Sequence, residues 1–190
     1  MEKTVNRAFS GLVAAAVFFG AAASAGAQGY NPFQIGASGG VAFPTGDLGN
    51  TTNTGYNVAV AVGYKSQLMP IGVRLEAAYN QFGLQGGGGS INVPAFTGNL
   101  TYELPLGMSF TPYAIGGVGL YRPSAGFNGG GSTQAENDFG WNIGGGIKIP
   151  LSSSFETFVE ARYNSFNIGG GAANGGGTGS FIPVTVGVMF

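Results

Sequence analysis

The sequence contains no cysteine and no histidine among its 190 residues. Without cysteine the chain has no disulfide framework and no thiolate nucleophile. Without histidine it lacks the commonest general base and the commonest metal ligand of proteins. The two absences exclude the enzymes that depend on these side chains. The lack of cysteine also agrees with export to a compartment where free thiols are a liability.

Charge is also scarce in this sequence. Asp, Glu, Lys and Arg make up 8% of the residues, the formal net charge is −1, and basic clusters are absent. Bulk electrostatics therefore favours neither nucleic acid nor an anionic membrane surface as a partner. Hydrophobic residues make up 44% and there are 38 glycines, which is too apolar for a disordered chain and too rich in glycine for an ordinary soluble domain.

The apolar run near the N-terminus is short for a membrane-spanning helix. It covers residues 12–19, whereas a helix needs roughly 20 apolar residues to cross a bilayer. Lys3 and Arg7 precede the run, and the small residues 25–27 follow it. This order of features is typical of a secretory signal peptide that is cleaved before Gln28. We therefore expect a signal peptide over residues 1–27 and a mature domain over residues 28–190.

From Gln28 onward the chain alternates apolar and polar residues with a period of two, and no segment of helical length carries an apolar stripe of period 3.6. The pattern predicts eight strands, over residues 32–43, 55–65, 71–82, 91–104, 110–122, 138–149, 155–166 and 181–190. Short connections alternate strictly with longer ones that are rich in Gly, Asn, Ser and Thr. Strands of about 10 residues joined in this way are typical of transmembrane barrels, in which periplasmic turns are tight and outward loops are long. The predicted fold class is all-β, an eight-stranded antiparallel up-and-down transmembrane β-barrel.

Side-chain parity predicts that the charged residues face the interior of this barrel. In residues 55–65, for example, Tyr56, Val58 and Val60 share one face, and the other face is small or polar. By the same count eight charged residues point inward, four of each sign: Lys65, Arg74, Glu76, Glu103, Lys148, Glu156, Glu160 and Arg162. An Arg or Lys that faced lipid at mid-depth would cost roughly 2–4 kcal/mol. The balance of signs predicts a closed ion-pair network that plugs the lumen, with Gly144 and Gly146 leaving room for long side chains such as Arg162.

Aromatic residues on the outward parity give a measure of depth. Tyr56 and Tyr64, Tyr113 and Tyr121, and Phe155 and Tyr163 are each eight residues apart. At about 3.3 Å per residue and a strand tilt near 40°, this separation spans roughly 20 Å, close to the distance between two aromatic girdles. Trp141 belongs to the same outward set. In residues 110–122 this assignment turns the apolar Val118 and Leu120 inward, which makes the parity of that strand the least regular.

Several motifs together indicate a family. The segments GYNV and EAAYNQF return as GWNI and EARYNSF about 85 residues later, which indicates an internal repeat of a two-hairpin unit. With FPTGDL at residues 43–48 and the closing VTVGVMF, the mature chain resembles the OmpX-like and opacity-protein-like eight-stranded outer-membrane barrels. The resemblance implies that Val184, Val186, Val188 and Phe190 form the signal read by the barrel-assembly machinery. It also implies a role in adhesion or host interaction, in envelope structure, or as a narrow conduit.

Catalytic and ligand-binding interpretations have less support. Small outer-membrane barrels that act on lipid A, phospholipids or peptides rely on histidine, so the resemblance implies no enzyme of those kinds here. Glu76 and Glu160 could form a carboxylate pair of glycosidase type, but ion pairing with Arg74 and Arg162 is the simpler account. The glycine runs contain no GK[ST] motif for phosphate. The loop residues Asp47, Glu136 and Asp138 lack the ligand density of a calcium site.

The sequence thus predicts a non-enzymatic protein of the bacterial outer membrane with both termini in the periplasm and a structural or cell-surface interaction role. The alternative is a narrow, porin-like conduit for small solutes, since the inward glycines could leave water-filled gaps. We expect no cofactor and no metal. The expected partners are outer-membrane lipids, the assembly machinery and an extracellular partner of the loops, with the protein itself a monomer.

Overall fold

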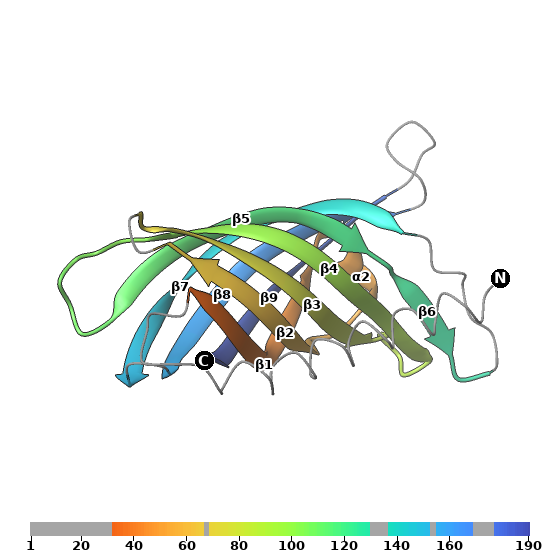
Figure 1. The fold of residues 1–190 in the computed structure, drawn as a ribbon. Coiled ribbons are helices and arrows are strands. Elements are labelled where there is room, and N and C mark those ends of the chain that lie inside the picture. Colours follow the sequence, from red (N-terminus) through yellow and green to blue (C-terminus); the bar gives the residue numbers. More distant parts are fainter. Residues whose placement is uncertain (1–31, 67–68, 130–136, 153–154, 169–176) are drawn as a thin grey trace.

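Eight long strands of the chain close into an antiparallel barrel in the computed structural model, which describes residues 32–66, 69–129, 137–152, 155–168 and 177–190 (Figure 1). The strands are β1 (Phe33–Thr45), β2 (Gly55–Lys65), β3 (Ile71–Gly83), β4 (Gly89–Glu103), β5 (Thr111–Tyr121), β7 (Asp138–Ser152), β8 (Phe155–Asn167) and β9 (Thr178–Met189). Each strand pairs with its neighbours along the chain, and β1 pairs with β9 to complete the circle. The predicted fold class is confirmed. The predicted signal peptide lies outside the described residues.

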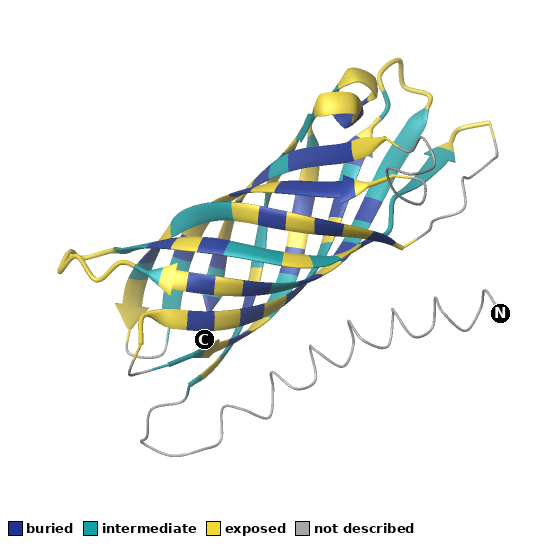
Figure 2. Cartoon of the chain, turned by 90° about the horizontal axis from the view of Figure 1, so that it is seen from above, coloured by how far each residue is buried: buried dark blue, intermediate teal, exposed yellow. Residues whose placement is uncertain are grey.

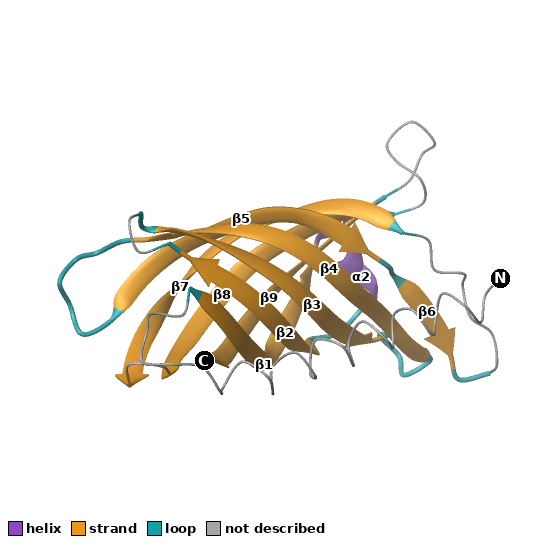
Figure 3. Cartoon of the chain, in the orientation of Figure 1, coloured by secondary structure: helices purple, strands orange, loops and turns teal. Residues whose placement is uncertain are grey.

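Two short elements lie in segments that the sequence had assigned to loops (Figure 3). The helix α2 (Gly46–Thr51) follows β1, and the strand β6 (Ser124–Phe127) extends the sheet by pairing with the start of β4. Both belong to the end of the barrel that carries the longer connections, which we call the loop end. The opposite end, which carries the turns after β2, β4 and β7, is called the short-turn end. Within the described residues no helix has the length and apolarity needed to cross a membrane.

Exposed residues alternate with more buried ones along much of the barrel wall (Figure 2). On β2 the outward Tyr56, Val58 and Val62 are exposed, and the inward Asn57 and Ala59 are buried. The alternation follows from the pleat of a strand, which sends successive side chains to opposite faces. An apolar outer face and a polar inner face are the arrangement that a lipid environment requires of a barrel wall.

The predicted parity of one strand is wrong. On β5, Tyr113 and Tyr121 are 3% and 0% exposed and face the interior, whereas Val118 and Leu120 are both 51% exposed and face outward. The two tyrosines therefore do not belong to the aromatic girdles. The physical reason is that both phenol groups have interior partners: Tyr113 donates to Glu160 and Tyr121 donates to Asn164. A tyrosine hydroxyl that is buried usually has a hydrogen-bond partner, and these two have theirs inside the barrel.

Candidate functional site

Four charged side chains fill the middle of the barrel, and we call them the central ion group: Arg74, Glu76, Glu160 and Arg162. Arg74 and Glu76 lie on β3, and the other two lie on β8. Nη2 of Arg74 donates to both carboxylate oxygens of Glu160, at 2.8 and 2.6 Å. Arg162 pairs with Glu76 across the barrel and with Glu160 on its own strand, the latter at 2.8 Å. The signs alternate around the group, so each charge lies between two of the opposite sign.

The central ion group is almost inaccessible to water. Its four side chains belong to residues that are only 2–5% exposed. Charges buried to this extent are costly to desolvate and remain ionised only when they are paired and hydrogen-bonded. Gly144 on the neighbouring strand permits the packing, because a Cβ there would come within 2.7 Å of Cα and Cγ of Arg162. Gly146 leaves corresponding room for the ring of Tyr113.

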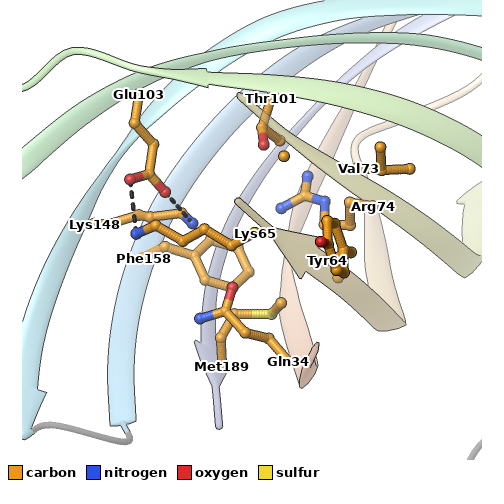
Figure 4. Close-up of a pocket in the computed structure, with 12 residues that line it drawn as sticks. Gln34, Tyr64, Lys65, Val73, Arg74, Thr101, Glu103, Lys148, Phe158 and Met189 are labelled. Atoms are coloured by element: carbon orange, nitrogen blue, oxygen red, sulfur yellow. Dashed lines mark hydrogen bonds and ion pairs between the residues drawn. The ribbon is translucent and has the colours of Figure 1, made fainter. Parts of the chain in front are cut away.

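The other four lumen charges form a separate cluster at the short-turn end, which we call the end ion group: Lys65, Glu103, Lys148 and Glu156. Glu103 accepts from Lys65 at 2.7 Å and from Lys148 at 2.8 Å (Figure 4). Lys148 also pairs with Glu156 at 3.0 Å. All eight predicted lumen charges therefore have ion-pair partners, but they are arranged as two groups of four and not as one network.

Aromatic side chains separate the two ion groups. The hydroxyl of Tyr113 donates to Glu160 at 2.6 Å, and Nζ of Lys148 lies 5.4 Å from the centre of the same ring. The guanidinium carbon of Arg74 lies 5.7 Å from the ring centre of Phe158. Beside these rings is a small cavity, lined by residues that include Lys65, Arg74 and Phe158, in which about 20 Å³ is open to the centres of water molecules (Figure 4). This volume is enough for about one water molecule.

Asparagine side chains occupy the next layer toward the loop end. Asn57 donates to Asn80 at 2.7 Å, and Asn142 donates to Asn99 at 2.8 Å. Asn164 accepts from the hydroxyl of Tyr121 at 2.9 Å. These amides connect neighbouring and distant strands through short polar contacts. They form the boundary between the charged middle of the lumen and an apolar region beyond it.

That apolar region contains four aromatic residues, which we call the aromatic plug: Phe82, Tyr121, Phe166 and Phe181. The rings of Tyr121 and Phe166 are stacked with centres 5.2 Å apart and planes at 11°. Phe181 contacts Phe82 and Phe166 edge-on, with ring centres 5.4 and 6.2 Å apart. All four are at most 2% exposed.

The helix α2 closes the aromatic plug at the loop end. Its residue Leu48 is buried in the same apolar cluster. Backbone bonds fix the helix on two sides, because Gly46 bridges to Gly179 of β9, and the amide of Gln85 donates to the carbonyl of Thr51 at 3.0 Å. The helix is therefore anchored to the barrel wall at both of its ends.

Residues 11–190 match the family model described as the outer membrane protein beta-barrel domain. The chain belongs to this family. It is consequently a membrane-embedded barrel of the outer membrane.

Solved structures show the same fold. The crystal structure of Neisserial surface protein A aligns with a TM-score of 0.68 at 16% identity, covering 85% of this chain and 98% of that chain. A major outer membrane protein from Thermus thermophilus gives 0.55 at 14%, covering 84% and 99%. OprG of Pseudomonas aeruginosa gives 0.51 at 17%, covering 87% and 99%. A comparison with curated proteins found no match.

The remaining predicted girdle residues of this outer-membrane barrel lie on its outer surface. Tyr56, Tyr64, Trp141 and Tyr163 are exposed, and Phe155 is half-buried. Several have aromatic neighbours on the adjacent strand. Tyr56 lies 6.4 Å from Tyr79, Trp141 lies 5.6 Å from Tyr163, and Tyr64 lies 5.4 Å from Phe33, measured between ring centres.

The predicted assembly signal lies on β9 and just beyond it. Val184 and Val186 are exposed on the outer face, Val188 is half-buried, and Phe190 is exposed. Phe190 also extends the closure of the barrel, because its amide and carbonyl both bond to Ile35 of β1, at 2.8 and 3.0 Å. Its ring lies 5.0 Å from that of Phe155.

Among the calcium candidates, Asp47 and Asp138 are described, whereas Glu136 lies outside the described residues. In the part of the chain that the structure describes, no three acidic, histidine or cysteine side chains gather as a metal site would require. Glu76 and Glu160 were the residues considered for a carboxylate pair. Each of their carboxylates is bonded to arginine, as the ion-pairing interpretation expects.

Sequence reasoning missed the aromatic plug and its helix. A signal for two members was present, since Phe82 and Phe166 end the repeated segments EAAYNQF and EARYNSF on the same parity as the inward glutamates. No comparable signal marked Leu48, because its burial depends on where the chain returns over the barrel mouth.

Proposed function

We propose that this outer-membrane protein is a sealed, non-enzymatic barrel with a structural or cell-surface interaction role. The observation that carries the proposal is the burial of the lumen side chains. In the central ion group and in the aromatic plug, every member is at most 5% exposed. An interior of eight strands is just wide enough to be filled by side chains, and these two groups fill it at two successive depths.

Conductance in planar bilayers tests the seal. The purified protein is expected to produce no steady ion-sized openings at neutral pH. A larger barrel of known conductance, inserted in the same bilayer, is the control for the recording. Steady openings would favour the alternative role of a narrow conduit for small solutes and would overturn the sealed barrel.

The contacts of the two central carboxylates support a role without catalysis. Glu76 and Glu160 both contact Arg162, and Glu160 also accepts from Arg74 and Tyr113. A carboxylate in contacts of this kind is not free to attack or protonate a substrate. Incubation of the pure protein with outer-membrane lipids is expected to leave them intact, and lipid turnover that disappears in Glu160→Gln would contradict this.

The surface role is assigned to the loop end, with both termini in the periplasm. The longer connections at that end are rich in Gly, Asn, Ser and Thr, and loops carry function more often than the scaffold that positions them. Cells that lack the protein, and the same cells complemented with it, can be compared for binding to host surfaces and for envelope integrity. Loss of binding alone indicates a surface partner, whereas loss of integrity alone indicates a structural role.

Assembly is assigned to the last strand. We expect Phe190→Ser to reduce the amount of folded protein in the outer membrane, as measured by the gel mobility of unheated samples. Val118→Ser, which changes an exposed outward residue on β5, is the matched control. Equal loss in the two variants would contradict a specific role for Phe190.

A further inference from the structure

The turn between β4 and β5 is apolar, although it lies beyond the outward aromatic residues at the short-turn end of the barrel. Residues 104–110 have the sequence LPLGMSF and contain no charged residue. Leu104, Leu106, Met108 and Phe110 are all exposed, Leu106 at 60%. They follow Tyr102, an exposed aromatic residue at the short-turn end of β4. Beyond such a girdle a barrel normally meets water and presents polar side chains.

This turn continues the lipid-facing surface of the barrel. Leu100 and Tyr102 are exposed on the outer face of β4, and Leu104 and Leu106 extend the same two-residue spacing past the end of the strand. Figure 3 shows the turn as a loop that projects from this end of the barrel. Large exposed apolar patches mark contacts with another protein or with a membrane.

The first residues of the turn also have satisfied backbone donors. Leu104 donates to the carbonyl of Pro112 at 2.8 Å, and Leu106 donates to the carbonyl of Leu104 at 2.9 Å. Between them, Pro105 has no amide hydrogen. The first three residues of the turn therefore present no free N–H group. Satisfied backbone donors are the main requirement for entering hydrocarbon.

The other connections at the short-turn end carry the same kind of side chain. Met69 lies between β2 and β3 and is 57% exposed, and Leu151 at the end of β7 is 60% exposed. Phe190, where the chain ends beside β1, is exposed as well. The apolar residues thus surround the rim instead of marking one side. A protein partner would contact one side, whereas a lipid leaflet contacts the whole circumference.

We propose that the short-turn rim is a lipid-anchoring surface, and that residues 104–110 insert into the head-group and acyl boundary of the adjacent phospholipid leaflet. The inference goes beyond the proposed sealing role and does not depend on it. Apolar and aromatic side chains at this depth would hold the barrel at a fixed height and resist its displacement toward the loop end.

Site-directed spin labelling tests the proposal, because the chain has no native cysteine. Leu106→Cys is labelled with a nitroxide and the full chain is reconstituted in vesicles of phosphatidylethanolamine and phosphatidylglycerol. Leu100→Cys is the lipid-facing reference, and Thr54→Cys, an exposed position at the loop end, is the aqueous reference. Collisions with oxygen, which concentrates in the bilayer, are compared with collisions with a water-soluble nickel chelate.

The ratio of oxygen to nickel accessibility at position 106 is expected to be several-fold higher than at position 54 and to approach that at position 100. Met69→Cys and Leu151→Cys are expected to behave like Leu106→Cys. A ratio at position 106 equal to that at position 54 overturns the proposal. A label shielded from both reagents also overturns it, because this result indicates a protein contact such as a second copy of the chain. The conductance of the unlabelled protein is a separate measurement, so failure of the lipid anchor and failure of the seal are distinguishable.

Discussion

The central ion group and the aromatic plug fill the same lumen by opposite means. In the ion group each side chain depends on a specific partner of opposite charge, as in the bonds from Arg74 to Glu160 at 2.8 and 2.6 Å. In the plug the rings stabilise one another by general packing contact. Phe166, for example, lies 5.2 Å from Tyr121 and 6.2 Å from Phe181, measured between ring centres. Loss of one ionic partner leaves an uncompensated buried charge, whereas loss of one ring leaves a cavity. The comparison shows that one barrel can be filled by two mechanisms that fail differently.

The largest effect is expected for Glu160→Ala. The change removes the acceptor of Arg74, Arg162 and Tyr113 together, and two buried guanidinium groups then face only Glu76. We expect a loss of about 5 kcal/mol, at the upper end of the range for one partner of a buried ion pair. Urea unfolding in lipid vesicles, followed by the fluorescence of Trp141, measures it. Val159→Ala, next in the chain but exposed on the outer face, is the control, and equal losses in the two variants would contradict the prediction.

A somewhat smaller effect is expected for Phe166→Ala in the aromatic plug. Removal of a fully buried ring should cost about 3–4 kcal/mol, since the neighbours collapse only partly into the space. Positions 160 and 166 on β8 are about 20 Å apart along the strand, so the losses from Phe166→Ala and Glu160→Ala should add within about 0.5 kcal/mol. Strong non-additivity in the double variant would show that the two groups are one cooperative unit.

Arg74→Lys should have an intermediate effect. Lysine keeps the charge but not the planar group that donates twice to Glu160 and lies over Phe158. We expect a loss of about 1.5–3 kcal/mol, the value of a hydrogen bond to a charged group. The reverse exchange in the end ion group, Lys148→Arg, is the comparison, because the ammonium of Lys148 already pairs with two carboxylates. If Arg74→Lys lost less stability than Lys148→Arg, the charge of Arg74 and not its planar shape would stabilise the central ion group.

The smallest effect is expected for Lys65→Met. The Lys65 side chain is 38% exposed, and its partner Glu103 keeps Lys148 at 2.8 Å when Lys65 is lost. A partly solvated pair is screened by water and salt, so the cost should be about 0–1 kcal/mol and should shrink further in high salt. Unfolding curves at low and high salt measure both quantities. A larger loss of stability that does not change with salt would contradict the prediction, because it would show that Lys65 contributes as the buried charges of the central ion group do.

Much of the wall was predictable because alternation is a local property. Eight strands, their approximate limits and the inward direction of Arg74, Glu76, Glu160 and Arg162 follow from counting residues in twos. The parity prediction for β5 was wrong because the alternation of that strand is ambiguous. Small residues and glycines lie on both of its faces, and a tyrosine is suited either to an aromatic girdle or to a lumen that offers a polar partner. The identity of that partner, Glu160 for Tyr113, is not a property of the strand on which the tyrosine lies.

The sequence by itself determined an outer wall of apolar residues, an inner wall of polar ones, and the near equality of opposite charges within. Only the tertiary structure decided that these charges divide into two groups, that Arg74 meets Glu160 while Arg162 meets Glu76, and that Leu48 closes an aromatic plug. The physical reason is that strand alternation depends on neighbours in the chain, whereas contacts across the lumen depend on the stagger of strands around a closed barrel. That stagger is fixed only when the first strand bonds to the last.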